Sequence, residues 1–256
     1  MELNVVYNED CLEGMNRIED KSVDMILCDL PYGTTKCKWD TIIPFEPLWK
    51  QYKRVIKDNG VICLFADEPF SSILVTSNLE MYRYELIWKK PQGTDFLNAN
   101  RKPLKSHEKI QIFYKSQPIY NKQYTYSKPY KAVDGHKDSS VWGKFKFGMN
   151  KSSDGERNPI SVLEYKQEKG LHPTQKPIKL CEYLIKTYTN EGDIVLDNCM
   201  GSGTTAIACM NTNRNYIGFE LDKGYYDIIL ERIKNHKPDV KPDVIQESKQ
   251  GLETWF

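Results

Sequence analysis

Residues 29–33 read Asp29-Leu30-Pro31-Tyr32-Gly33, and they follow an apolar run from Val23 to Cys28. That run is typical of a buried parallel strand. Pro31 lacks the backbone N–H that a sheet ladder needs, so the strand must end before it, and Gly33 allows the turn that follows. The sequence therefore places a carboxylate and an aromatic ring at the carboxyl end of a strand, where open α/β sheets bind their ligands.

A carboxylate that accepts hydrogen bonds, beside a ring that can stack, is a suitable binding site for a flat base that carries an amino group. An ordinary acidic turn at the end of a strand would account for the same five residues, because short motifs often match by chance. The choice between these two interpretations depends on the rest of the chain.

A second junction of strand and turn lies in the C-terminal third. Residues Asp193–Asp197 are typical of a buried strand, Gly201-Ser202-Gly203 follow, and a helix is expected over Ala206–Met210. The next strand, Tyr216–Phe219, ends at Glu220, which gives the βαβ order of nucleotide-binding units. Glycines let a ligand approach the backbone closely, and the start of the helix offers N–H donors.

The pattern of this turn favours a nucleoside ligand over a phosphate. The dinucleotide motif G-x-G-x-x-G is not completed, because position 206 is Ala206, and no lysine follows the glycines as in a Walker motif. Glu220 is placed to bind two ribose hydroxyls. A nucleoside with a polar amino-acid tail, such as S-adenosylmethionine, fits this pattern, and a purely structural glycine turn is the alternative.

The segments between the two junctions predict further strands and helices. Apolar residues at helical spacing mark Phe45–Lys57, and Asn59-Gly60 is typical of a helix stop. Strands are expected at Val61–Ala66, Tyr84–Trp88 and Ile110–Lys115, with a polar loop between the last two. Strands that alternate with helices predict an α/β fold with a doubly wound, mostly parallel, Rossmann-like sheet.

Charge is distributed unevenly along the chain. The net charge is +1, but residues 88–151 contain 14 Lys or Arg and 4 Asp or Glu, so this stretch carries +10 and the remainder −9. A local basic block favours a polyanionic partner. Lysine-rich surfaces are common, but the aromatic residues interleaved with these lysines weigh against that simpler explanation. Five basic side chains are candidates for contacts with DNA: Lys89, Lys90, Arg101, Lys102 and Lys105.

Composition excludes several classes of protein. With 256 residues, 39% of them hydrophobic, the chain can bury a sizeable core. No apolar run approaches the ~20 residues of a membrane span, and the N-terminus lacks the features of a signal peptide, so a cytoplasmic protein is expected. Seven scattered cysteines without metal-binding spacing predict reduced thiols and no metal site.

Periodicity divides the chain into four parts. Residues 1–115 and 171–236 have regular strand and helix patterns, and we expect them to form two halves of one domain. Residues 116–170 have many Lys, Tyr, Ser and Asn, which predicts an inserted, loop-rich region with a weak core of its own. Residues 237–256 are expected to form a flexible tail.

Taken together, the motifs resemble those of amino-group DNA methyltransferases. Asp29-Leu30-Pro31-Tyr32 is similar to their acid-Pro-Pro-Tyr motif, with Leu30 where the family more often has proline. Gly201-Ser202-Gly203 resembles their cofactor motif, and residues 172–177 resemble the segment that precedes the cofactor strand. The order of catalytic motif, recognition region and cofactor motif is that of the β group, and the resemblance covers residues 5–233.

The resemblance implies transfer of a methyl group from S-adenosylmethionine to the exocyclic N6 of a flipped adenine in double-stranded DNA. Residues 116–170 would form the target-recognition region. The implied catalytic residues are Asp29, Leu30, Pro31 and Tyr32. The implied cofactor-binding residues are Asp10, His172, Thr174, Lys176, Asp197, Met200, Gly201, Ser202, Gly203, Thr204 and Glu220.

Within the cofactor site, the resemblance places Asp10 at the adenine end, although the same residue could simply cap a helix. It places His172, Thr174 and Lys176 near the methionine carboxylate.

Three alternatives remain open. Methylation of cytosine N4 would use the same binding site for the base, although the cytosine enzymes more often have serine at the position of Asp29. An RNA methyltransferase would suit the basic and aromatic block. A catalytically silent nucleic-acid-binding subunit would keep the fold. The resemblance also implies two candidate partners, a second copy of the chain and a cognate restriction endonuclease.

Overall fold

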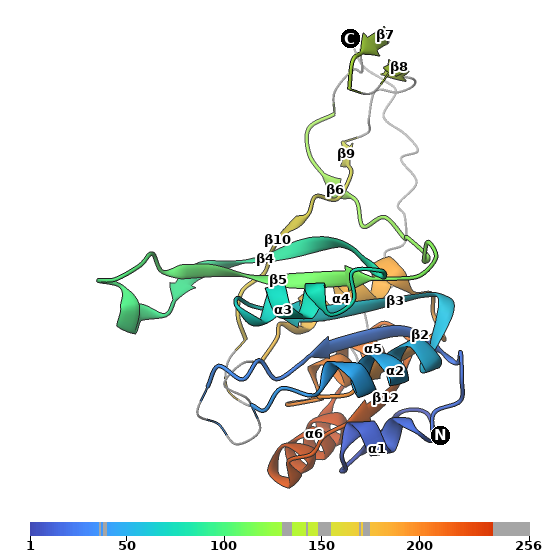
Figure 1. Ribbon diagram of the computed structural model, residues 1–256, viewed down its shortest axis with the longest axis vertical. Helices are drawn as coiled ribbons and strands as arrows, with labels where there is room; N and C mark the ends of the chain where they lie inside the picture. The colour runs from blue at the N-terminus through green and yellow to red at the C-terminus, as the bar shows by residue number, and fades with distance from the viewer. Residues whose placement is uncertain are drawn as a thin grey trace, which may run out of the picture.

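An eight-stranded sheet forms the centre of the protein (Figure 1), in the strand order β1-β12-β11-β2-β3-β5-β4-β10. The computed structural model describes residues 1–35, 37, 40–129, 135–141, 143–147, 155–168, 170 and 175–237. All neighbouring strands of this sheet pair in parallel except at β5, which is antiparallel to both β3 and β4. The predicted α/β class with a mostly parallel, Rossmann-like sheet is therefore confirmed.

The strands of the sheet are β1 (Val5–Tyr7), β2 (Val23–Asp29), β3 (Ile56–Ala66), β4 (Tyr82–Thr94), β5 (Lys105–Phe113), β10 (Val162–Glu164), β11 (Ile194–Asp197) and β12 (Asn215–Phe219). The helices are α1 (Cys11–Met15), α2 (Phe45–Val55), α3 (Phe70–Thr76), α4 (Ile178–Tyr188), α5 (Thr204–Asn211) and α6 (Lys223–Asn235). Within the described ranges, no helix is long and apolar enough to cross a membrane.

Helices cover both faces of the sheet, and β2 shows how. Met25 and Leu27 belong to the core formed with α4, α5 and α6, whereas Ile26 and Cys28 belong to the core formed with α1, α2 and α3. Successive side chains of a strand point to opposite faces. Because both faces are buried, the strand reads as an unbroken apolar run rather than as an alternating pattern.

The carboxyl ends of the parallel strands meet at one edge of the sheet. Asp29 and Asp197 are the last residues of β2 and β11, and Glu220 directly follows β12. Asp10 follows β1 and caps α1. The topology thus brings together acids that are widely separated in sequence.

The boundary between α2 and β3 differs from the sequence prediction. The helix ends at Val55, and β3 begins at Ile56, so the prediction of Asn59-Gly60 as the helix stop is wrong. The pairing of β3 with β2 shifts register between Ile56 and Val61. A Cβ on Gly60 would lie 2.9 Å from the carbonyl oxygen of Asp24. The glycine is required by this close approach of two strands, not by a helix terminus.

Strands β4 and β5 extend well beyond their predicted bounds. The predicted polar loop between them is largely a paired hairpin, in which Lys89 is opposite His107 and Thr94 is opposite Lys105. A short 3₁₀ helix, η1 (Phe96–Asn98), lies near its tip. In Figure 1 the hairpin projects beyond the sheet on the side toward which β2 points. Because this part of the hairpin has no buried apolar face, its sequence does not indicate a strand.

The region of residues 116–170 contains short strand pairs. β6 (Thr125–Tyr126) pairs with β9 (Glu156–Arg157), and β7 (Gly135–Ser139) pairs with β8 (Gly143–Phe147), in the arm that extends upward in Figure 1. One element departs from the predicted separate core, because β10 pairs in parallel with β4 as the edge strand of the main sheet.

Because β2 lies in the middle of the sheet, a cavity beside it should lower the stability of the protein strongly. Leu27 is fully buried, so Leu27→Ala should lower the free energy of unfolding by about 2–5 kcal/mol. Urea denaturation should show a lower midpoint with an unchanged slope. The matched control is Leu79→Ala, since Leu79 is 63% exposed, and it should change stability by less than about 0.5 kcal/mol. Equal losses in the two variants would contradict this description of the core.

Candidate active site

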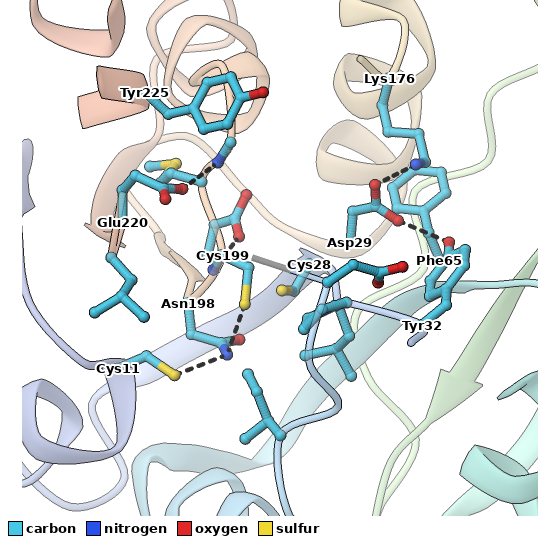
Figure 2. A pocket seen from close by; sticks show the side chains of 18 of the residues that line it. Cys11, Cys28, Asp29, Tyr32, Phe65, Lys176, Asn198, Cys199, Glu220 and Tyr225 are labelled. Atoms are coloured by element: carbon cyan, nitrogen blue, oxygen red, sulfur yellow. Dashed lines mark hydrogen bonds and ion pairs between the residues drawn. The ribbon is translucent and has the colours of Figure 1, made fainter. Parts of the chain in front are cut away.

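A pocket of about 650 Å³ opens at the carboxyl edge of the sheet. Its wall is formed by residues from the ends of β1, β2, β3, β11 and β12. Figure 2 shows two groups of side chains in it. Asp29, Tyr32 and Lys176 lie on one side, and Glu220, Asn198 and Cys199 lie on the other.

Asp29 is held by two donors. The Tyr32 hydroxyl donates a hydrogen bond of 2.7 Å to Oδ1, and the Lys176 ammonium group donates to Oδ2. The Asp29 side chain is still 24% exposed, which leaves it accessible from the pocket. The carboxylate is therefore fixed in orientation and has unshared lone pairs that can accept further hydrogen bonds.

The residues after Asp29 have distinct surroundings. Leu30 is 3% exposed and packs in the core with α2 and α3, which explains how an apolar side chain replaces the family's proline. The Tyr32 ring stacks on Phe70 of α3, with 5.0 Å between ring centroids and 22° between planes. Tyr32 is thus supported from behind by a second ring, while its hydroxyl stays on Asp29.

Lys176 lies at the centre of a buried charge network. Its Nζ contacts Asp29, lies 3.6 Å from Glu108 Oε2 and sits 5.2 Å from the centroid of the Phe65 ring. Burial works against the charged form, but the two nearby carboxylates raise the pKa of Lys176 above its usual value. Glu108 also accepts an ion pair from Lys90, and the two lysines together lower the pKa of Glu108 despite its burial.

This network changes the expected place of two residues. Lys176 was expected near the methionine carboxylate of the cofactor; it borders the pocket, and its ammonium group contacts Asp29. Lys90 was expected to contact DNA, but its side chain is only 5% exposed because it points inward to Glu108. Glu108 is not among the residues predicted for the site, because the pairing of β4 with β5 is what places it at the pocket.

Asp40 organises the loop that follows Gly33. Its carboxylate accepts hydrogen bonds from the backbone N–H groups of Gly33, Thr34 and Thr35, at 2.6–2.9 Å. Burial would raise its pKa, but these donors lower the pKa of Asp40 overall. The first part of this loop is therefore tied to a buried acid.

Glu220 faces the other side of the pocket. Its Oε2 accepts from the Gly201 N–H at 2.7 Å, and its Oε1 accepts from the Asp222 N–H at 2.9 Å. Burial is the main cause of a raised pKa of Glu220. Each oxygen keeps a lone pair for a ligand. Two oxygens side by side match the two hydroxyls of a ribose, as the sequence predicts.

Three other predicted cofactor residues, Asp197, Asp10 and Gly203, stabilise or shape the local backbone. Asp197 accepts from Thr205 Oγ1 at 2.6 Å and from the Cys199 N–H at 3.0 Å, and burial raises its pKa to about 6. Asp10 caps α1 by accepting from the Leu12 N–H at 2.8 Å, and it also borders the pocket. Gly203 has φ +79° and a Cβ there would lie 3.0 Å from Ile229, so this glycine is required by the local backbone and packing.

The remaining predicted cofactor residues divide into two sets. Met200, Gly201, Ser202 and Thr204 border the pocket. His172 and Thr174 lie outside the described residues.

Asn198 and Cys199, which the sequence analysis does not predict as site residues, also border the pocket. Asn198 is buried, and its Oδ1 accepts a hydrogen bond from the Tyr52 hydroxyl of α2. Its Nδ2 lies 3.5 Å from the sulfurs of Cys11 and Cys199. Asn198 thus connects β11 with α1 and α2 across the floor of the pocket.

The predicted DNA-contact residues lie on the β4–β5 hairpin. Lys89 pairs with Glu164, Lys102 with Asp95 and Lys105 with Asp67. Arg101 is exposed near the tip. Apart from Lys90, these residues lie along one projecting element next to the pocket.

The pocket fits S-adenosylmethionine in its chemistry. Glu220 offers two acceptors for ribose hydroxyls, and Gly201 at φ +55° allows close approach of a ligand to the turn. Leu221, which borders the pocket and is 69% exposed, offers apolar surface to a ligand. Asp29 lies across the pocket from this group (Figure 2), so a transferred group and its acceptor would meet between the two sides.

Comparisons with known proteins agree with this geometry. The model of the DNA methylase family, of the N6/N4 methyltransferase type, matches residues 23–231. The chain is 30% identical over 252 residues to the Type II methyltransferase M1.MboII of Moraxella bovis, which covers 88% of this chain and 94% of that protein.

Solved structures show the same fold. The crystal structure of the M1.HpyAVI–SAM complex superposes with a TM-score of 0.61 at 25% identity, over 89% of this chain and 98% of that one. The cytosine-N4-specific PvuII DNA methyltransferase superposes with a TM-score of 0.64 at 14% identity, over 92% of this chain and 87% of that one, which is a likeness of fold. The chain therefore belongs to the DNA methylase family of S-adenosylmethionine-dependent N6/N4 methyltransferases.

Proposed function

We propose that this enzyme methylates the exocyclic N6 of adenine within a specific sequence of double-stranded DNA. The observation that carries the proposal is the carboxylate of Asp29, which is oriented by Tyr32 and Lys176 and exposed to the pocket. Because the target base pairs inside the duplex, it must be flipped out to reach Asp29.

Asp29 acts on the amino group of the flipped base. The nitrogen lone pair of adenine is delocalised into the ring, which makes N6 a poor nucleophile. A hydrogen bond from the amino group to Asp29, and another to a backbone carbonyl of the Leu30–Pro31 segment, favour a pyramidal nitrogen and orient its lone pair. S-adenosylmethionine supplies an electrophilic methyl group on a sulfonium. As the N–C bond forms, Asp29 stabilises the positive charge that develops on nitrogen.

Lys176 serves as a positioning residue for this carboxylate. It faces both Asp29 and Glu108, which without a cation between them would repel each other in a buried site. Lys176 thereby offsets this repulsion and restricts the rotation of Asp29. Both oxygens of Asp29 already accept hydrogen bonds, from Tyr32 and Lys176, so we infer that the amino proton leaves to solvent rather than to Asp29.

Cytosine N4 is the second candidate for the acceptor. The same two hydrogen bonds would hold a cytosine amino group, and the fold is shared with a cytosine-N4 enzyme. The presence of Asp29, where the cytosine enzymes more often have serine, favours adenine. The names of relatives as Type II methyltransferases support a role beside a cognate restriction endonuclease.

The direct test is identification of the product. The purified enzyme is incubated with unmethylated DNA and labelled S-adenosylmethionine, and the DNA is digested to nucleosides for mass spectrometry. We expect N6-methyladenine. N4-methylcytosine would overturn the choice of base, label on RNA alone would overturn the substrate class, and cofactor binding without any product would favour a silent subunit.

Substitutions of Asp29 and Glu220 should have separate effects, the first on methyl transfer and the second on cofactor binding. Asp29→Ala should lower turnover by about 10²-fold or more, because it removes the acceptor for developing charge, and leave the affinity for S-adenosylmethionine unchanged. Glu220→Ala should weaken cofactor binding in calorimetry by about tenfold, because it removes the ribose acceptor. Each variant is the control for the other, and normal turnover in Asp29→Ala would contradict its proposed role.

Replacement of Lys176 should shift the pH dependence of turnover. In Lys176→Met, only Lys90 remains to balance Asp29 and Glu108, so the two carboxylates together retain a proton to higher pH. The acidic limb of the kcat profile should therefore move to higher pH, by about one unit or more. Lys179→Met, which removes a lysine that is 56% exposed, is the control and should leave the limb in place. An unmoved limb in Lys176→Met would show that Lys176 has only a packing role.

A further inference from the structure

The β4–β5 hairpin ends in a pair of exposed apolar side chains. We define the hairpin tip as residues Asp95–Leu104. Phe96 is 75% exposed and Leu97 is 84% exposed, the latter the highest exposure of any large hydrophobic residue among those described. Large apolar side chains that project together from a tip indicate a contact surface.

The hairpin tip lies at the edge of the sheet that holds the active site. β4 runs parallel to β3, as shown by their common antiparallel neighbour β5, so its carboxyl end lies at the same edge as Asp29. Trp88 of β4 is opposite Glu108, which borders the pocket. From that level the hairpin continues to the pair of Thr94 with Lys105, which lies three residues of β5 beyond Glu108, a reach of about 10 Å at about 3.3 Å per residue. Figure 1 shows the tip beyond the sheet on this side.

The hairpin tip is also suited in charge to a polyanion. Its single acid, Asp95, forms an ion pair with Lys102 and accepts a hydrogen bond from Asn98 at 2.7 Å. Arg101 is exposed beside them. The tip thus presents two apolar side chains and a guanidinium group, with its acid neutralised internally.

We propose that Phe96 and Leu97 insert into the base stack of the DNA whose base occupies the active site. This proposal rests on the proposed function, because only an enzyme that flips a base leaves a gap in the stack. Flipping costs unstacking and unpairing energy. Apolar side chains that enter between base steps are a known means of stabilising such distorted duplexes. The paired strands of the hairpin and the Asp95–Asn98 contact hold the two side chains at a fixed distance from the pocket.

The test compares one double variant on two DNA substrates. The target site is first mapped by sequencing modified bases in DNA from cells that express the wild-type enzyme. Phe96→Ala/Leu97→Ala is then assayed on a fully paired duplex and on the same duplex with an abasic site opposite the target base. On the second duplex the target base is unpaired, so flipping costs less. Leu79→Ala, another exposed leucine, is the control.

We expect kcat/KM of the double variant to fall at least about tenfold on the paired duplex and less than about threefold on the duplex with the abasic site. The fluorescence rise of 2-aminopurine at the target position should be reduced in parallel. Affinity for S-adenosylmethionine should be unchanged.

Three results would overturn the proposal. Equal losses on both duplexes would show that the hairpin tip only adds affinity for DNA. No loss on either would show that it does not act on DNA. A change in sedimentation velocity of the double variant would show that the tip contacts a second copy of the chain. Absence of methylated DNA from the wild-type enzyme would instead count against the proposed function itself.

Discussion

The buried ion pair between Lys176 and Asp29 is the interaction on which the active site depends. The two residues are 147 positions apart, and the pair joins the end of β2 to the segment that leads into α4. With Glu108 and Lys90, it forms a set of two cations and two anions from four separate segments, β2, β4, β5 and the segment before α4. Such charges are tolerated in a buried site only when they are matched. The ion-pair network around Asp29 therefore forms only when each of these segments has folded into place.

The sheet supplies the second constraint. Its central strands are apolar on both faces, because α1, α2 and α3 cover one face and α4, α5 and α6 the other. Polar groups with a chemical role can then lie only where the strands end. Asp29 at the end of β2, Asn198 directly after β11 and Glu220 directly after β12 lie at that edge for this reason. The two sides of the pocket meet there because opposite halves of the chain contribute the adjacent strands β2 and β11.

Local patterns in the sequence predicted the elements that depend on local physics. The apolar run before Pro31 predicted β2, and the glycine turn with Glu220 predicted one side of the pocket. Contacts made by distant pairing were not predictable in this way. Glu108 borders the pocket only because β5 pairs with an extended β4, and the polar sequence of that hairpin gives no periodic signal. For the same reason, Lys176 was expected near the cofactor and Lys90 near DNA, since neither partner is close in sequence.

The way in which the segment between β5 and β10 joins the sheet has an evolutionary consequence. The chain leaves the sheet after Phe113 of β5 and returns at Val162 of β10, and the two strands are separated only by β4. Val162 is level with Lys109, four residues before Phe113 on β5, so this offset and two strand spacings place the ends about 17 Å apart. A continuous insert with neighbouring ends can be exchanged for another without disturbing the core. Replacing this one segment would change the surface beside the pocket, while the strands that end at Asp29 and Glu220 are inherited unchanged.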